Sequence, residues 1–353
     1  MTAGNQGLMS VTLDDVNALA SLDPSDMLRQ MVDLPSQLSA SLSSKVTVER
    51  SPRKLCFCGL GGSAMGADIL CDHLERTAKV CSSVVRDVQL PAWVDEDTLT
   101  IMISYSGNTR ETMAMYNEAI SRNAKICAIS SGGRLVQSCQ ERGDHLITVP
   151  SGLQPRAALG HLLGAAASII EAADVAPVAT ELKSLLPAIK EEVKACSPVS
   201  SGAANVAKTI ARSLDGKMPF IYSSRSVRTA GRRWQTQINE NAKVLCLYGE
   251  LPESDHNQIV GWIDGARDRN NVPVFLNAAS DVGMMADIVR ATVSIFEDFG
   301  LEPITVDLKG QTPLENVMRG IVIGDFVSYY LAILKGVDPL PVSSISELKK
   351  RLG

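Results

Sequence analysis

Short apolar runs alternate with stretches of helical periodicity along almost the whole chain. In the first half, the apolar runs predict strands at residues 54–60, 83–87, 99–104, 124–130 and 145–149. Helical patterns fill the gaps between these runs and continue over residues 156–174 and 181–195. This alternation is typical of a parallel sheet with helices on both faces, so we expect an α/β fold.

The same alternation begins again after a cluster of Ser, Pro and Gly residues at 197–202, which are typical of a loop. It predicts strands at 219–223, 244–248, 272–277 and 304–308, and helices at 227–243, 282–299 and 313–334. We therefore expect two domains of the same class. The first spans residues 1–197 with its leading and linking helices, and the second spans residues 198–353 and ends in a short amphipathic helix at 345–352.

Length and composition fit a two-domain globular protein. The chain has 353 residues, of which 45% are hydrophobic and 21% are charged, and this composition is far from that of disordered proteins. Its 34 basic and 39 acidic residues give a net charge of −5, which argues against nucleic acid and anionic membranes as partners. An anionic ligand would therefore need a local site.

The spacing of the cysteines, the first residues and the length of the apolar stretches favour a cytoplasmic protein with reduced thiols. Of the eight cysteines, only Cys56 and Cys58 lie close together, and no Cys-x-x-Cys pair occurs. The first residues lack the basic and apolar regions of a secretory signal, and the apolar stretch 157–170 is too short to span a bilayer. The four histidines are isolated in the sequence, so we expect no metal site.

The first segment with candidate chemistry is Gly-Leu-Gly-Gly-Ser-Ala-Met-Gly at 59–66, which follows a predicted strand and opens a helix. Its glycines allow a ligand to approach the backbone, and the helix N-terminus offers N–H groups to a phosphate. Gly59, Gly61 and Ala64 also match the dinucleotide fingerprint G-x-G-x-x-G/A, with Asp87 placed to bind a ribose. A tight turn without a ligand explains the segment equally well.

The second segment, Ser-Tyr-Ser-Gly-Asn-Thr-Arg-Glu-Thr at 104–112, places three hydroxyl groups and a glycine where a strand gives way to a helix. Hydrogen bonds to a charged group are worth about 1.5–3 kcal/mol each, so such a cup can hold a phosphate monoester without a lysine. The simpler interpretation is that Asn108 or Thr109 only caps the helix. A cap needs one oxygen rather than three, and a dinucleotide fold has no need of this loop.

Two further segments carry ionisable side chains. The predicted helix at 227–243 ends in Asn-Glu-Asn, which helix propensity explains poorly, and Glu240 and His256 could act as base and acid. Arg156 follows a proline at a helix start. Taken singly, each of these residues is more often a surface or structural residue than a catalytic one.

Together these segments resemble the bifunctional phosphoglucose/phosphomannose isomerase family, a branch of the phosphoglucose isomerase superfamily built from two sugar isomerase (SIS) domains. The resemblance runs from Gly59 to Leu352 through GLGGSAMG, SYSGNTRET, SSGGRL, PRAAL, QINENAK, ELPESDHNQIVGW and the tail GVDPLPVSSISELKKRLG. SYSGNT is common to SIS sensors and isomerases. The order and spacing of PRAAL, NENAK, the ELPE–HN stretch and the C-terminal lysine are more specific.

The resemblance implies an isomerase that interconverts fructose 6-phosphate with glucose 6-phosphate, and with mannose 6-phosphate as a further substrate, without a cofactor. It implies a substrate-binding set made of Gly61, Gly62, Ser63, Ser104, Ser106 and Thr109. The hydroxyls of Ser104, Ser106 and Thr109 would hold the phosphate, and the other three residues would complete the cradle.

The resemblance also implies four catalytic residues. Glu240 would move a proton between carbons 2 and 1 through a cis-enediolate, which Arg156 would stabilise. His256 and Lys349 would open the sugar ring. In the superfamily the histidine typically comes from the neighbouring subunit, which implies a homodimer.

One position departs from the family pattern. Some members have a threonine seven residues before the final lysine, where it has been linked to the mannose epimer, but this chain has Val342. Two other functions remain open: a non-catalytic SIS sensor, which would need the hydroxyl cup alone, and an NAD-dependent oxidoreductase, which would need a dinucleotide cleft after Gly59. The joint presence of Glu240, His256 and Lys349 weighs against the sensor.

Overall fold

The computed structural model describes residues 13–48, 51–265, 268 and 270–352. The chain divides into two compact units, an N-terminal unit of Gln30–Lys190 and a C-terminal unit of Met1–Arg29 with Glu191–Gly353. The first helices join the C-terminal unit because polar contacts attach them there. Asp14 accepts a hydrogen bond of 2.8 Å from the buried Nζ of Lys208, and Ser25 donates one of 2.8 Å to Asp338. The division into domains at residues 197 and 198 stays a prediction.

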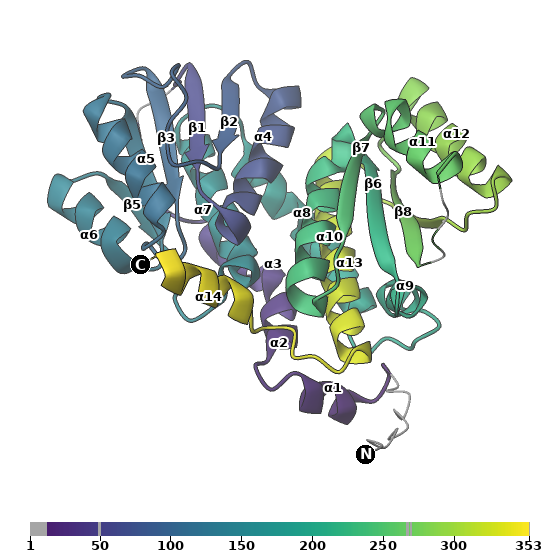
Figure 1. The fold of residues 1–353 in the computed structure, drawn as a ribbon. Helices are drawn as coiled ribbons and strands as arrows, with labels where there is room; N and C mark the ends of the chain where they lie inside the picture. Colours follow the sequence, from purple (N-terminus) through teal and green to yellow (C-terminus); the bar gives the residue numbers. More distant parts are fainter. Residues whose placement is uncertain (1–12, 49–50, 266–267, 269, 353) are drawn as a thin grey trace. The chain divides into compact units, whose positions relative to one another are not determined.

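The N-terminal unit is built on a five-stranded parallel sheet in the order β2-β1-β3-β4-β5. The strands are β1 (Lys54–Cys58), β2 (Cys81–Val85), β3 (Thr98–Ile103), β4 (Lys125–Ser130) and β5 (His145–Thr148). On one face lie α5 (Arg110–Ser121) and α6 (Gly133–Arg142), and on the other α4 (Met65–Thr77) and α7 (Leu159–Ala172), with α3 (Leu34–Ser41) packed on α7 (Figure 1).

Burial of both faces explains why the central strands β1, β3 and β4 consist largely of continuous apolar runs rather than alternating patterns. Every residue of β3 is buried. Cys56 and Cys58 of β1 pack with Met102 and Tyr116 in a core beneath α5, so Leu55 and Phe57 face the opposite layer.

The C-terminal unit contains a four-stranded parallel sheet in the order β7-β6-β8-β9. Its strands are β6 (Met218–Ser224), β7 (Leu247–Leu251), β8 (Asn271–Ala278) and β9 (Ile304–Leu308). One face carries α10 (Arg228–Gln237) and α13 (Pro313–Leu334), with α9 (Val206–Leu214) against α13, and the other carries α11 (Gln258–Ile263) and α12 (Met284–Asp298). The remaining helices are α1 (Val16–Leu22), α2 (Met27–Val32), α8 (Val178–Cys196) and α14 (Ser343–Leu352).

Among the described residues, α13 is the one helix long and apolar enough to cross a membrane. Its most apolar window is 89% buried within the protein, which is typical of a core helix. Arg233 of α10 donates two hydrogen bonds, of 2.8 and 2.7 Å, to Asp325 in the middle of this helix. The nearly uniform apolar character of α13 therefore reflects neighbours on most of its sides.

The expected α/β fold class is confirmed: both units contain parallel sheets flanked by helices. The C-terminal elements at 304–308 and 313–334 begin and end where the sequence predicts them. The strand expected at 244–248 lies at Leu247–Leu251 instead, because residues up to Cys246 finish the turn after α10. Helices α9 and α11 were not predicted.

Candidate active site

Two loops meet at the point where the order of the first sheet reverses. The chain passes from β1 to β2 on one side and then returns to β3 on the other, so the segments after β1 and β3 are neighbours. In open parallel sheets, ligands bind outside the carboxyl ends of the strands at this switch point. The turn Gly61–Ala64 and the loop 104–109 both lie there.

The turn after β1 packs directly against the turn that carries Arg156. Gly61 has a φ of +54°, a conformation that favours glycine. At Gly62, a β-carbon would lie 2.6 Å from the backbone nitrogen of Arg156 and 2.7 Å from its Cα, so a side chain has no room. Arg156 itself is 3% exposed. The absence of a side chain at Gly62 thus allows the backbone of this buried arginine to pack against the turn after β1.

The serine and threonine hydroxyl groups of the loop after β3 each make a hydrogen bond within the loop. Ser104 is buried and donates a hydrogen bond of 3.1 Å to the hydroxyl of Thr109, while the exposed Ser106 accepts one of 3.3 Å from the backbone of Asn108. Thr109 occupies the N-cap position of α5, but within the described structure its side chain makes no capping bond. Capping alone therefore does not account for the hydroxyl groups.

Asn108 has a structural role in this loop. Its side-chain oxygen accepts a hydrogen bond of 3.0 Å from the backbone of Arg134, in the first turn of α6. A β-carbon at Gly107 would lie 1.8 Å from the carbonyl oxygen of Gly132. The segment SSGGRL therefore supports the hydroxyl loop from behind.

Tyr105, which was not singled out from the sequence, connects all of these segments. Its backbone nitrogen donates to the Ser63 hydroxyl at 3.2 Å, and its carbonyl accepts from the backbone of Ser131 at 2.9 Å. Its phenol donates to the carbonyl of Pro150 at 2.8 Å and accepts from the backbone of Leu153 at 2.9 Å. Burial raises the pKa of this phenol, which keeps its proton available for the bond. In the sequence, the position of Tyr105 between two serines was the only sign of this connecting role.

In the C-terminal unit, Glu240 lies at the centre of a π-helical turn, Ile238–Ala242, that continues α10. The side chain is half-buried. π-helical turns are rare and are frequent at functional sites. The Asn-Glu-Asn sequence was therefore correctly identified as unusual for a helix.

The two asparagines beside Glu240 anchor the turn through their side chains. Asn239 accepts a hydrogen bond of 3.0 Å from the backbone of Cys246, and the fully buried Asn241 donates one of 2.9 Å to Ser328 of α13. Lys243 ends the turn with a φ of +53° and donates 2.9 Å hydrogen bonds to the carbonyls of Glu240 and Asp338. These bonds fix the backbone on both sides of the carboxylate.

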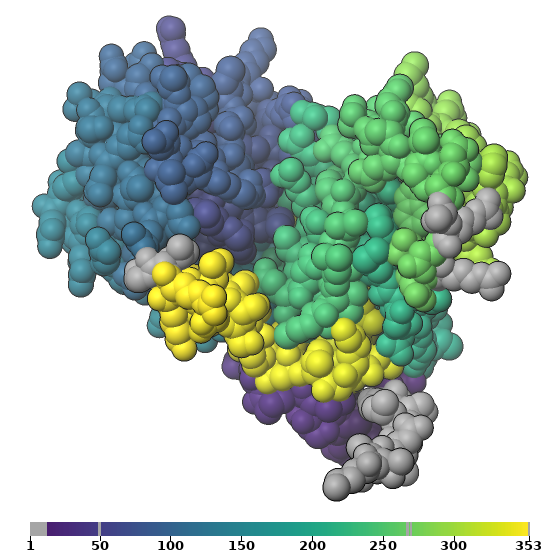
Figure 2. Space-filling view, in the orientation of Figure 1, coloured from purple at the N-terminus to yellow at the C-terminus, as the bar shows by residue number. Residues whose placement is uncertain are grey.

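His256 and Lys349 are exposed in the C-terminal unit. His256 ends the turn Glu253–His256, which is held by a 3.1 Å hydrogen bond from Thr292 of α12 to Asp255. Burial raises the pKa of Asp255. Lys349 belongs to α14, which lies at the surface in yellow in Figure 2. Glu240, His256 and Lys349 thus come from three different elements of this unit, and Arg156 belongs to the other unit.

The four strands of the second sheet follow the same order as the first four strands of the first sheet, but the described residues at their carboxyl ends form no matching hydroxyl cup. The switch point of the second sheet lies after β6 and β8, where Ser226 donates a hydrogen bond of 2.5 Å to the carboxylate of Asp281. A carboxylate in that place repels a phosphate. Among the described residues, only the first sheet therefore has a hydroxyl cup suited to an anion.

The structure supports a dinucleotide site less well than it supports the hydroxyl cup. The order 2-1-3-4-5 of the first sheet is that of flavodoxin-like folds rather than the classical dinucleotide order. Asp87 lies two residues beyond the end of β2 and accepts a hydrogen bond of 2.6 Å from the backbone of Val88. Within the part of the chain that the structure describes, no cluster of three His, Cys, Asp or Glu side chains could hold a metal ion.

Known families and proteins agree with this arrangement. Residues 50–159 match the SIS domain family, and residues 203–352 match the family described as the bacterial phospho-glucose isomerase C-terminal SIS domain. The chain is 33% identical to a bifunctional phosphoglucose/phosphomannose isomerase of Aquifex aeolicus over 84% of this chain and 90% of that protein. The chain belongs to the bifunctional phosphoglucose/phosphomannose isomerase family.

Another member of the family, from Caldicellulosiruptor bescii, is 32% identical over 92% of this chain and 98% of its own length. Among solved structures, a glucose-6-phosphate isomerase like protein from Thermus thermophilus matches with a TM-score of 0.63 and 21% identity, covering 94% of this chain and 98% of that one. The C-terminal domain of glucosamine-fructose-6-phosphate aminotransferase from Francisella tularensis matches with a TM-score of 0.67 and 16% identity, covering 94% and 100%. These likenesses confirm the SIS fold, and the relatives confirm the family expected from the sequence.

Proposed function

We propose that this protein is an aldose-ketose isomerase that interconverts fructose 6-phosphate with glucose 6-phosphate and also acts on mannose 6-phosphate. Its relatives named bifunctional phosphoglucose/phosphomannose isomerases match it over most of the chain. The observation that carries the proposal is the packing of Gly62 against the buried Arg156 beside a cup of hydroxyl groups. A phosphate and an anionic intermediate need these two features next to each other.

In this proposal the cup holds the phosphate group. Ser104, Ser106 and Thr109 supply hydroxyl donors, and the backbone of Gly61 and Gly62 completes the cradle. Ser63 accepts its hydrogen bond from Tyr105, so its own hydroxyl proton can be donated to the substrate. Hydrogen bonds to the phosphate persist through the reaction, so they act mainly on substrate affinity.

Glu240 is the proposed base. Its carboxylate removes the proton from carbon 2 of the aldose, and the bonding electrons form the carbon–carbon double bond of a cis-enediolate. The proton then returns to carbon 1, while a hydroxyl proton moves between the two oxygens. Arg156 stabilises the negative charge of the enediolate with a cation that burial holds in place.

His256 and Lys349 open the ring in this proposal by passing protons to and from the ring oxygen and the anomeric hydroxyl. His256 is exposed at the end of a turn, so it can serve the site of a second subunit. We infer a homodimer in which His256 reaches the partner's site. The reduced cysteines and the metabolic family also favour a cytoplasmic location.

A coupled assay tests the activity. Fructose 6-phosphate, glucose-6-phosphate dehydrogenase and NADP report isomerisation as NADPH formation, and EDTA in the same sample tests a metal requirement. We expect turnover that EDTA leaves unchanged. Binding of sugar phosphate without turnover would instead favour a non-catalytic SIS sensor.

The change Glu240→Gln tests the base. Glutamine keeps the shape of the side chain but cannot accept the carbon-bound proton, so we expect turnover to fall by about 100-fold to 10,000-fold, while the dissociation constant for glucose 6-phosphate changes little. Ser106→Ala is the matched control, because it should raise KM and leave kcat near its normal value. A Glu240→Gln enzyme with more than half of normal activity would show that another group is the base.

A further inference from the structure

The side chain of Lys243 connects two segments of the C-terminal unit that are far apart in the sequence. Lys243 ends the π-helical turn of Glu240, and its Nζ donates hydrogen bonds to the carbonyls of Glu240 and Asn241 at 2.9 and 3.1 Å. The same Nζ donates to the carbonyls of Asp338 and Pro339 at 2.9 and 3.0 Å. One ammonium group therefore joins the turn of the proposed base to the segment that follows α13.

The end of a helix explains only two of these four acceptors. The last carbonyls of a helical turn have no partner within the turn, and a lysine near a helix C-terminus can bind them. The carbonyls of Asp338 and Pro339 belong to a different segment, and a helix cap needs neither of them. Hydrogen bonds from a charged donor are stronger than those between neutral groups. The bonds to the second segment are therefore more than a by-product of capping.

The backbone of Lys243 is in a conformation that suits glycine better than lysine. Its φ of +53° and ψ of 40° lie in the left-handed helical region, where a side chain is unfavourable. Helices commonly end with a glycine in this conformation. Strained positions persist where the surrounding contacts hold them, and they are frequent at functional sites. The lysine side chain thus has a role that a glycine could not fill.

The second segment leads to Lys349. The carboxylate of Asp338 accepts hydrogen bonds of 2.8 Å from Ser25 and 3.0 Å from the backbone of Leu340, so this segment is anchored on several sides. Helix α14 follows and carries Lys349, and its residues 343–351 are all exposed. The side-chain hydrogen bonds described for α14 stay within the helix and its cap. The position of Lys349 therefore depends on the anchored segment before the helix.

We propose that Lys243 is a positioning residue, which fixes the segments of Glu240 and Lys349 relative to each other. This inference rests on the proposed function, in which Glu240 moves the proton between carbons and Lys349 opens the ring. The four hydrogen bonds of Lys243 go to backbone carbonyls, so it acts through the backbone. The hydroxyl cup belongs to the other unit, so the loss of Lys243 lowers kcat rather than substrate affinity.

Hydrogen exchange followed by mass spectrometry tests the connection without any measurement of activity. Lys243→Met keeps the length of the side chain but removes its donors, so we expect faster exchange in peptides covering 238–246 and also in those covering 336–346. Lys335→Met is the matched control, because Nζ of Lys335 donates one described bond, of 3.2 Å, to the carbonyl of Lys243. Faster exchange confined to 238–246 would reduce Lys243 to a helix cap and overturn the proposal.

Steady-state kinetics with fructose 6-phosphate separates positioning from stability. Lys243→Met should lower kcat by about tenfold with little change in KM, and Lys243→Arg should recover part of the loss because it keeps a charged donor. Lys243→Gly suits the left-handed backbone, so it should lower kcat as the methionine does without lowering thermal stability. Lys335→Met should stay near the wild type. A normal kcat in Lys243→Gly would contradict the proposal.

A double-mutant cycle shows whether Lys243 acts through Lys349. In a Lys349→Met background the ring-opening group is already absent, so the loss caused by Lys243→Met should shrink from about tenfold to about threefold. The same tenfold loss in both backgrounds would show that Lys243 serves Glu240 alone and would overturn the coupling. An inactive wild type would instead overturn the proposed function, and the exchange experiment would still decide whether the two segments are joined.

Discussion

Tyr105 uses all of its polar groups to connect parts of the candidate active site. Its backbone bonds to Ser63 and Ser131, and its phenol holds the segment between Pro150 and Leu153 that leads to Arg156. Tyr105 touches none of the proposed reacting atoms through these bonds. We therefore regard it as a positioning residue for Arg156.

Tyr105→Phe should lower kcat by about tenfold with little change in KM. The loss of one hydroxyl leaves the backbone of Leu153 and Pro150 without their partner, which costs about 1–2 kcal/mol, and the poorer placement of Arg156 affects the enediolate more than the bound sugar. Steady-state kinetics on fructose 6-phosphate measures both constants. Tyr116→Phe is the control, since its phenol bonds to Asp144 away from these loops. If both variants lose only thermal stability, Tyr105 has a purely structural role.

Val342 lies directly before α14, and its carbonyl accepts hydrogen bonds from Ile345 and Ser346 at 3.1 and 3.2 Å. It therefore occupies the position of a helix cap, where threonine is favourable and valine is not. Under the proposed function, a hydroxyl at this position would lie near carbons 2 and 3 of the sugar and would stabilise the rotated enediol that leads to the mannose epimer. Valine offers only methyl groups.

We expect kcat/KM for glucose 6-phosphate to be well above that for mannose 6-phosphate, and Val342→Thr to raise the mannose value by up to about tenfold, the effect of one hydrogen bond of about 1.4 kcal/mol. Val342→Ala lacks the hydroxyl and should not raise it. The value of kcat/KM is measured with glucose 6-phosphate and with mannose 6-phosphate for the wild type and for each variant. Equal wild-type ratios for the two epimers would show that another group, such as Ser343, already performs this role.

At the level of elements, the candidate site depends on short turns rather than on long helices. The turns Gly61–Ala64 and Pro155–Ala158 pack on each other, and the π-helical turn Ile238–Ala242 presents Glu240 between two anchored asparagines. Such turns place single side chains with little freedom. The glycines of Gly61–Ala64 and the asparagines of Ile238–Ala242 are unfavourable in regular helices, because backbone geometry rather than helix propensity determines these two turns.

Gly62→Ala should reduce activity by at least tenfold while the protein remains folded. The added β-carbon would lie 2.6 Å from the backbone nitrogen of Arg156, so the two turns must separate and Arg156 must move. A misplacement of about 1 Å at a reacting centre can cost on the order of 100-fold in rate. The measurement is kcat/KM, and the far-ultraviolet circular dichroism spectrum shows whether the variant is folded. A folded variant with normal kcat/KM would show that the position of Arg156 is unimportant.

At the level of the whole molecule, the two units share a strand order but differ at their switch points. The N-terminal unit contains the hydroxyl loop and Arg156, whereas the C-terminal unit has Asp281 at the equivalent place and contains Glu240, His256 and Lys349. Under the proposed function each unit is therefore inactive alone. The subunit arrangement adds a further requirement if His256 serves a partner.

Mixing two inactive variants tests this requirement. Neither His256→Ala nor Glu240→Gln should be active as a homodimer, but a mixed dimer has one site with intact Glu240 and intact His256. With random exchange, about a quarter of all sites should recover activity, because a twofold interface pairs each site with the partner's histidine.

Activity after mixing is measured alongside the degree of subunit exchange, which differently tagged subunits report by mass. A mixture without exchange serves as the control and should stay inactive. Complete exchange with no recovered activity would place His256 in the site of its own subunit.

Local patterns in the sequence were enough to establish the fold class, most strands and the family. Buried parallel strands need continuous apolar runs, and the intervening helices need their own periodicity, so these elements are local properties of the chain. The motifs also identified the hydroxyl loop, Glu240 and Arg156 as candidate site residues, because glycine turns and clusters of hydroxyl groups can be recognised within short stretches of sequence. The prediction failed where local preference was weak, at the turn between α10 and β7 and at the short helix α11. It also missed α9, although Asn205 caps this helix and Ala207, Ile210, Ala211 and Leu214 lie at helical spacing.

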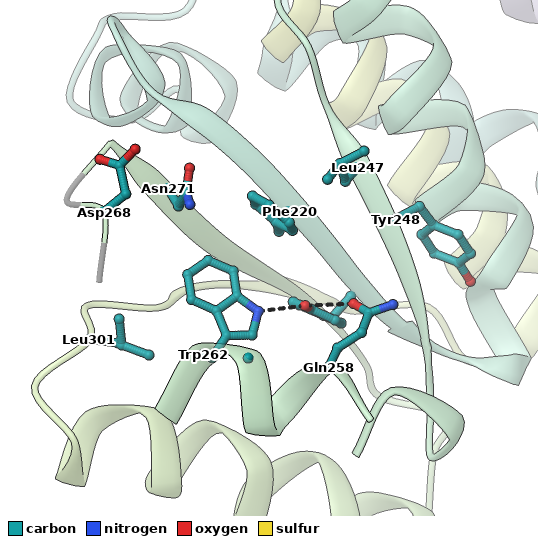
Figure 3. Close-up of a pocket in the computed structure, with 10 residues that line it drawn as sticks. Phe220, Leu247, Tyr248, Gln258, Trp262, Asp268, Asn271 and Leu301 are labelled. Atoms are coloured by element: carbon teal, nitrogen blue, oxygen red, sulfur yellow. Dashed lines mark hydrogen bonds between the residues drawn. The ribbon is translucent and has the colours of Figure 1, made fainter. Parts of the chain in front are cut away.

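The contacts that hold the candidate site together became visible only in the folded chain. The contact between Gly62 and Arg156 joins residues far apart in the sequence, and so do the bonds that Tyr105 makes to Pro150 and Leu153. In the C-terminal unit, a cavity lined by Gly261 and Trp262 likewise takes residues from β6, β7, β8 and α11, together with Asp268 and Leu301 from outside these elements (Figure 3). Such features arise from the approach of distant backbone segments, and neither periodicity nor residue spacing contains that information.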